Sequence, residues 1–270
     1  MKAQEKLNRK TEKALHICVG LDSDINKIPG HLKTKSNAIL EFNKRVIDAT
    51  YKHAAAYKIN FAFYENWGLE GFRTLEETIN FISNEVLIIA DAKRGDIGNT
   101  SKKYAESVFD YFKCDAVTLH PYMGYESVEP FLQYENKLNF ILGLTSNPSA
   151  SDFEKQKLEN GKYLYQEVIV KTNEWNQKSK NCGLVFGATN NEELKNNIDS
   201  FGNMPILLPG VGAQGGSLED VIKIFYSDKK NNFIINISRG LLYIDESENF
   251  EAKIKDKIIE YNQLVEKHIP

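Results

Sequence analysis

Residues 91–96, with the sequence DAKRGD, place four charged side chains directly after an apolar run. The run, residues 86–90 (VLIIA), is typical of a strand buried on both faces. Because side chains alternate along a strand, Asp91 and Lys93 are expected on one face, with Asp96 in the loop that follows. Charges that open into a polar pocket avoid the desolvation cost of a core, so this strand end is a candidate active-site wall.

Two other apolar runs end in matching polar groups. Asp22 closes residues 15–22, and Lys58 and Asn60 share one face of residues 55–63. Lysine and aspartate are seldom buried unless they are paired. Together with the charges of residues 91–96, these side chains predict one network of alternating sign. A purely structural salt bridge remains the alternative for any single pair.

A glycine-rich stretch in the C-terminal part of the chain predicts an anion site. Residues 209–216 (PGVGAQGG) allow backbone N–H groups to approach a phosphate closely, and Arg239 can bind it with paired donors. Residues 210–215 also match the dinucleotide pattern GxGxxG. That interpretation requires a first strand–helix turn and an acidic residue ending the next strand, whereas the next run ends in Ser238 and Arg239.

The elements that must position these residues follow a regular alternation. Short apolar runs too short for helices lie at residues 15–22, 55–63, 86–93, 115–122, 139–146, 183–189, 205–212 and 233–240. Stretches with helical spacing lie between or after them, at residues 36–54, 74–85, 100–113, 163–177, 190–201, 218–230 and 250–269. Eight strands that alternate with helices in a chain of this length predict a (β/α)₈ TIM barrel of the α/β class. A doubly wound open sheet is the alternative, although no switch-point pattern supports it.

We expect the 270 residues to form a single barrel domain, because no linker or low-complexity tract divides them. A polar N-terminal helix is expected at about residues 1–14 and a loop–helix insertion at about residues 147–181, after the fifth strand. A polar loop at that end of a barrel is a candidate lid or a tolerated surface insertion.

Composition excludes several classes of protein. A formal net charge of −3 argues against a generally basic nucleic-acid-binding protein, and no apolar run approaches the length of a membrane helix. The polar N-terminus lacks the apolar core of a signal peptide, so a cytoplasmic location is expected. Three widely spaced cysteines without CxxC spacing favour reduced, buried side chains over disulfides or a zinc site.

With these motifs in place, the chain resembles the orotidine 5′-phosphate decarboxylase family. Residues 91–101 (DAKRGDIGNTS) resemble its DxKxxD motif and the threonine four residues later. The resemblance runs the length of the chain and includes "GLD" at Asp22, "YKIN" at Lys58, "LTSNPS", "PGVGAQGG" and "SRGLLY". The long segment after the fifth strand and residues 120–132 (HPYMGYESVEPFL) resemble the family's longer, second-type branch.

The resemblance implies loss of carbon dioxide from orotidine 5′-phosphate to give uridine 5′-phosphate, in pyrimidine biosynthesis and without a cofactor or metal. Carbanion character at carbon 6 must then be stabilised by electrostatics and positioning. Lys93 would protonate carbon 6, and Asp91 would lie beside the substrate carboxylate. Asp96 and Lys58 complete the implied catalytic network.

The remaining roles also follow from the resemblance. Ribose and the charge network involve Asp22 and Lys58, and Asn60 either orients Lys58 or contacts the ribose. Asp96 and Thr100 reach the neighbouring subunit's site, which implies a homodimer with shared active sites. The pyrimidine edge is read by Ser146 with Thr145 beside it, and the phosphate is bound by Gln214, Arg239 and the backbone N–H groups of Gly212 and Gly240.

Two alternative functions share part of this pattern. A metal-dependent barrel decarboxylase acting on 3-keto-L-gulonate 6-phosphate shares DxKxxD but places an acidic metal ligand on the second strand, where this chain has Lys58. A non-catalytic phosphate- or nucleotide-binding barrel would not need Asp91 and Lys93 together. Arg94 is expected in a salt bridge, and a structural role is favoured for His120.

Overall fold

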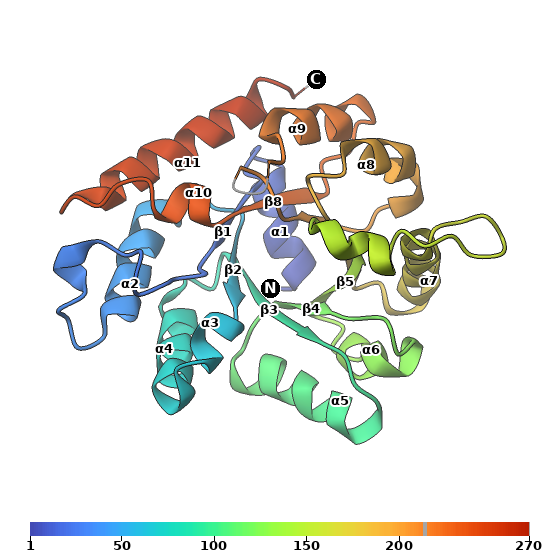
Figure 1. Cartoon of the computed structure of the whole chain (residues 1–270), viewed down its shortest axis with the longest axis horizontal. Helices are drawn as coiled ribbons and strands as arrows, with labels where there is room; N and C mark the ends of the chain where they lie inside the picture. Colours follow the sequence, from blue (N-terminus) through green and yellow to red (C-terminus); the bar gives the residue numbers. More distant parts are fainter. Residues whose placement is uncertain (213–214, 270) are drawn as a thin grey trace.

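The computed structural model describes residues 1–212 and 215–269, and in this part of the chain eight parallel strands close into a barrel (Figure 1). Each strand pairs with the next in sequence, and the last pairs with the first. The strands are β1 (Ile17–Gly20), β2 (Ala56–Asn60), β3 (Leu87–Arg94), β4 (Ala116–Leu119), β5 (Leu138–Leu144), β6 (Cys182–Phe186), β7 (Ile206–Leu208) and β8 (Phe233–Ile237). The predicted (β/α)₈ barrel is confirmed.

Most of the helices surround the barrel on its outer face, whereas the first lies across one of its ends (Figure 1). The helices are α1 (Ala3–Thr11), α2 (Ala38–Thr50), α3 (Ala62–Glu65), α4 (Gly68–Phe81), α5 (Gly98–Ala105), α6 (Tyr125–Leu132), α7 (Leu164–Ser179), α8 (Asn191–Asn197), α9 (Leu218–Ser227), α10 (Arg239–Leu242) and α11 (Phe250–Glu266). Shorter turns are η1 (Gly30–Leu32), the π-helical η2 (Glu106–Tyr111), η3 (Pro148–Asp152) and η4 (Ile198–Phe201). Among these residues no helix is long and apolar enough to cross a membrane.

The core has two parts, because each strand buries both of its faces. Outward-facing strand residues and the helices form the larger cluster, whereas the barrel interior holds a smaller one built from residues such as Cys18, Leu87 and Phe140. Ala3 and Leu7 of α1 belong to the interior cluster. Helix α1 therefore closes the end of the barrel at which the strands begin.

A buried ion pair fixes α1 in this position. Lys6 Nζ lies 2.7 Å from Asp115 Oδ2, and the same carboxylate accepts a hydrogen bond from the Ile88 N–H group. Charges buried so deeply are tolerated because they are paired and hydrogen-bonded. With this end sealed, the opposite end of the barrel, where the strands finish, is left for a site.

Candidate active site

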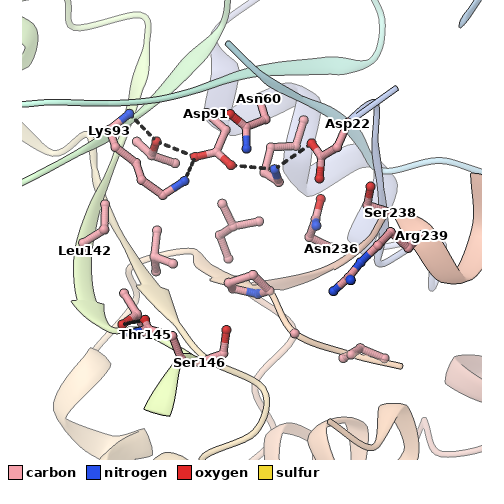
Figure 2. Close-up of a pocket in the computed structure, with 18 residues that line it drawn as sticks. Asp22, Asn60, Asp91, Lys93, Leu142, Thr145, Ser146, Asn236, Ser238 and Arg239 are labelled. Atoms are coloured by element: carbon pink, nitrogen blue, oxygen red, sulfur yellow. Dashed lines mark hydrogen bonds and ion pairs between the residues drawn. The ribbon is translucent and has the colours of Figure 1, made fainter. Parts of the chain in front are cut away.

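Asp91 is the centre of a charge network at the end of β3. Its Oδ2 lies 2.6 Å from Lys58 Nζ, and its Oδ1 lies 2.6 Å from Lys93 Nζ. On the other side of Lys58, Asp22 Oδ1 lies 3.6 Å from the same ammonium. Figure 2 shows Lys93, Asp91 and Asp22 in a row along one wall of the pocket. Of the predicted network, Asp22, Lys58, Asp91 and Lys93 are therefore joined. Asp96 lies apart from them, and its Oδ1 accepts a hydrogen bond from the Ile97 N–H group.

Electrostatics keep the buried Asp91–Lys58 pair ionised. Burial alone would raise the pKa of Asp91, but the ammonium groups of Lys58 and Lys93 outweigh it and hold the pKa below its usual range. Burial would likewise lower the pKa of Lys58, yet Asp91 and Asp22 reverse that effect and raise it. At neutral pH the wall therefore presents a fixed carboxylate between two ammonium groups.

Lys93 reaches Asp91 through an irregular backbone. The β3–β4 register shifts between Ala90 and Arg94, and Lys93 has a φ of 45°, in the left-handed region. Thr118 of β4 supports this conformation, since its Oγ1 accepts the Lys93 N–H at 3.0 Å and donates to Asp91 Oδ1 at 3.0 Å. Alternation of side chains along β3 predicted that Asp91 and Lys93 would be neighbours. Their contact is made from an irregular backbone that Thr118 holds in place.

The network lines a pocket of about 300 Å³ at the ends of the strands. Its walls differ in character (Figure 2). The strands β8, β1, β2 and β3 contribute charged and polar groups, whereas β5, β6 and β7 contribute Leu142, Val185 and Leu207. Such a cavity suits a ligand with one apolar face and one strongly polar side.

Most of the predicted site residues meet in this pocket. Those that line it are Asp22, Lys58, Asn60, Asp91, Lys93, Thr145, Ser146 and Arg239. Asp96, in the loop after β3, and Thr100, in α5, lie outside the pocket. Gly212, after β7, and Gly240, in α10, also lie outside it. Gln214 lies outside the described residues. Asn60 Oδ1 also accepts a hydrogen bond from the Ala62 N–H group, so it helps to start α3.

The glycine-rich segment after β7 folds back on itself beside Arg239. Gly210 and Gly212 have positive φ values of 102° and 76°, which favour glycine. The Gly216 N–H donates to the Gly210 carbonyl, and the Gly212 N–H donates to the Gly216 carbonyl. Gly210 and Arg239 line the pocket from this side, so an anion could be held at its rim.

A carboxylate absent from the sequence-based predictions fixes the loop after β5. Glu154 accepts hydrogen bonds from the Thr145 N–H at 2.6 Å and from the Thr145 hydroxyl at 2.8 Å. Asn190 adds a bond to the Thr145 carbonyl. The pocket face of this loop is therefore held in place by the insertion and by the start of α8.

Two other predicted residues lie beside the pocket without lining it. Arg94 is paired with Glu65 and lies over the Tyr104 ring, which confirms the expected salt bridge. His120 donates its backbone N–H to the Arg94 carbonyl. Burial, followed by the nearby Lys93 ammonium, lowers the pKa of His120.

Comparison with known proteins assigns this architecture. The model of the orotidine 5′-phosphate decarboxylase / HUMPS family matches residues 15–252. A Bacteroides fragilis orotidine 5′-phosphate decarboxylase is 46% identical over 239 residues, which cover 87% of this chain and 86% of the relative. The chain belongs to the orotidine 5′-phosphate decarboxylase family. Its named relatives are carboxy-lyases, and membership places the chain in that class.

Solved structures agree with the family assignment. The OMP decarboxylase of Leishmania donovani is 34% identical, with a TM-score of 0.84, and the match covers 98% of this chain and 99% of that one. The UMP synthase of the same organism is 35% identical with a TM-score of 0.85, and this chain spans 57% of its length. The decarboxylase fold is therefore common to these proteins and to the chain described here.

Sequence reasoning missed several polar pocket residues of this family member, among them Thr118, Asn236 and Ser238. Each lies in or directly after an apolar strand, and each lacks a charge. The same argument that found Lys58, a polar side chain within an apolar run, could have found them. Within residues 1–212 and 215–269, no three His, Cys, Asp or Glu side chains are grouped so as to hold a metal ion.

Proposed function

We propose that the chain converts orotidine 5′-phosphate to uridine 5′-phosphate and carbon dioxide through its own side chains. The observation that supports this most strongly is the Asp91 carboxylate held between the ammonium groups of Lys58 and Lys93 in the pocket. In the reaction the bond from carbon 6 to the carboxylate breaks, and its electron pair remains on carbon 6. The site must stabilise that charge and then supply a proton.

Lys93 is suited to both tasks. Its Nζ is anchored by Asp91 at 2.6 Å, while 45% of its side chain remains exposed. The ammonium stabilises the developing carbanion and then transfers a proton to carbon 6, after which the neutral amine regains a proton from solvent. Because Asp91 stays anionic, a substrate carboxylate beside it is repelled until it leaves as neutral carbon dioxide.

The rest of the pocket would orient the nucleotide. Arg239 and the glycine-rich segment at the rim suit the phosphate, and Asp22, Lys58 and Asn60 suit the ribose. The pyrimidine would lie against the apolar wall of β5, β6 and β7, with its edge toward Thr145 and Ser146. Binding energy from the distant phosphate then holds carbon 6 at Lys93.

We also propose that two subunits share each site. Asp96 and Thr100 lie outside their own pocket. Ile97, beside Asp96, and Tyr122 and Met123, in the loop after β4, are large exposed apolar side chains. The two loops are neighbours, since the His120 N–H donates to the Arg94 carbonyl. A second copy that covers this surface would bring Asp96 and Thr100 toward its own pocket.

The proposal is tested by incubating the purified protein with orotidine 5′-phosphate in the presence of EDTA and following the loss of substrate absorbance. We expect turnover that EDTA leaves unchanged. Absence of turnover by folded protein would refute the proposal, and turnover abolished by EDTA would favour the metal-dependent decarboxylase. The position of Lys58 argues against that rival, since its ammonium lies where a carboxylate ligand would be needed.

A further inference from the structure

The pocket wall formed by β8 contains polar groups to which the proposed mechanism gives no task. Asn236 lies on this strand and Ser238 directly follows it, both between Asp22 and Arg239 in Figure 2. Asn236 shares the inward face of β8 with Ile234, which belongs to the barrel-interior core. Both polar residues line the pocket.

These groups are buried without satisfying one another. Asn236 is 7% exposed, and its Oδ1 has no hydrogen-bond partner among the described residues. Ser238 Oγ and Asp22 Oδ1 are likewise buried without a hydrogen bond in residues 1–212 and 215–269, although Lys58 lies 3.6 Å from the latter. Unpaired polar atoms cost free energy when buried, so three along one wall indicate a place completed by a ligand.

The neighbouring strand β1 leaves room for the Asn236 carboxamide. A Cβ atom at Gly20 of β1 would lie 3.0 Å from Asn236 Oδ1, 3.3 Å from Asn236 Nδ2 and 2.8 Å from Ser238 Cβ. The glycine therefore lets both β8 side chains pack against the β1 backbone. This close packing holds Asn236 in one position, as a recognition group requires.

The chemistry of the substrate limits what can satisfy an acceptor here. Phosphate and carboxylate oxygens are themselves acceptors and cannot donate to Asn236 Oδ1. The donors of the nucleotide are the base N3–H and the two ribose hydroxyls. The base edge is proposed to face Thr145 and Ser146, which lie across the pocket from Asn236 (Figure 2). A ribose hydroxyl is the donor that remains.

We infer that Asn236 Oδ1 accepts a hydrogen bond from the 2′- or 3′-hydroxyl of the ribose and thereby recognises the sugar of the bound nucleotide. Ser238 extends the same polar wall toward the phosphate end at Arg239. The inference rests on the proposed function, because it assigns a further recognition group in the same site. Asn236 thus binds the substrate without taking part in the transfer of the proton.

The test measures the binding of uridine 5′-phosphate and its 2′-deoxy and 3′-deoxy counterparts by calorimetry. We expect Asn236→Leu to lower the affinity for uridine 5′-phosphate about 3- to 10-fold, the range for the loss of one hydrogen bond. The deoxy ligand that lacks the hydroxyl bound by Asn236 should bind the variant and the wild type with equal affinity, because it cannot make this hydrogen bond in either protein. Asn236→Ala makes the same comparison if the leucine variant does not fold.

Asn262→Leu is the matched control. Asn262, on α11, is similarly buried, and its Oδ1 also lacks a hydrogen-bond partner in the described part of the chain. The control should bind all three ligands as the wild type does. Equal weakening of all three ligands by Asn236→Leu, or no weakening of any, would overturn the inference. Failure of the wild type to bind uridine 5′-phosphate or to turn over orotidine 5′-phosphate would instead contradict the proposed function, and the inference with it.

Discussion

Replacing Asp91 by asparagine removes the charge that joins Lys58 to Lys93 while keeping the shape of the side chain. Lys58 and Asp91 are almost fully buried, with side-chain exposures of 5% and 8%, so the substitution leaves a buried ammonium without its main partner. Breaking a buried pair costs about 3–5 kcal/mol. The ion pair of Lys93 with Asp91 is half-exposed, and its loss adds about 1 kcal/mol or less to the cost.

Asparagine can still accept one hydrogen bond, and Asp22 remains near Lys58, so the lower end of the range applies. We expect Asp91→Asn to lower the free energy of unfolding by about 3 kcal/mol. For a chain of this size that corresponds to a fall in melting temperature of about 6–12 °C. Turnover should fall about 100-fold or more, because charge stabilisation and the position of Lys93 are both lost.

Asp115→Asn provides the matched control. Asp115 and Lys6 form an equally buried pair, with side-chain exposures of 10% and 8%, at the opposite end of the barrel. The control should lose similar stability and keep its turnover per folded molecule. The reasoning is refuted if Asp91→Asn is as stable as the wild type, or if both variants lose turnover equally.

The stability difference should also depend on pH. The pKa of Asp91 is lowered in the folded state from an unfolded value of 3.8, so its contribution is complete above that pH. The contribution is lost as the pH falls below 3.8 through the lowered pKa. Urea unfolding between about pH 6 and pH 3 should therefore show the free energy of unfolding of the wild type falling toward that of Asp91→Asn as the pH is lowered. A constant difference would contradict the assigned pKa direction.

Three further predictions concern the site. Lys93→Ala should abolish turnover and still bind uridine 5′-phosphate in calorimetry, and substantial residual turnover would exclude Lys93 as the proton donor. Mixing Lys93→Ala with Asp96→Ala subunits should restore some activity through hybrid dimers, and no recovery despite confirmed subunit exchange would contradict shared sites. Gly20→Ala should displace Asn236 and Ser238, because its methyl group would lie within 3.0 Å of each, and weaken uridine 5′-phosphate binding. Unchanged affinity would show that the β8 wall tolerates the movement.

The barrel was predictable because its strands are buried on both faces. Each therefore appears in the sequence as a short apolar run, and charged residues at the ends of these runs are conspicuous. Lys58 was found in this way, since a lysine within AYKINFAF needs a partner. The contacts of Lys58 with Asp91 and Asp22 followed from the adjacency of the first three strands.

Other features depend on details that periodicity does not encode. The positive φ of Lys93 lies where the β3–β4 register is irregular, and Thr118 of the next strand accepts the Lys93 N–H there. Glu154 reaches Thr145 because the insertion folds back over β5, and residues in a long polar loop have no fixed spacing to the strands. The same pattern, a polar residue within an apolar run, includes Asn236, but uncharged polar residues are common in strands. The unpaired Oδ1 atom, which the sequence does not show, distinguishes Asn236 from a structural residue.

The central claim, that Lys93 exchanges a proton with carbon 6, is tested most directly by NMR in deuterium oxide. Uridine 5′-phosphate is incubated with the wild type and with Lys93→Ala, and the loss of the carbon-6 proton signal is followed. We expect exchange of this proton with the wild type and none above background with the variant. Equal exchange by both proteins, or none by a wild type that turns over orotidine 5′-phosphate, would contradict it.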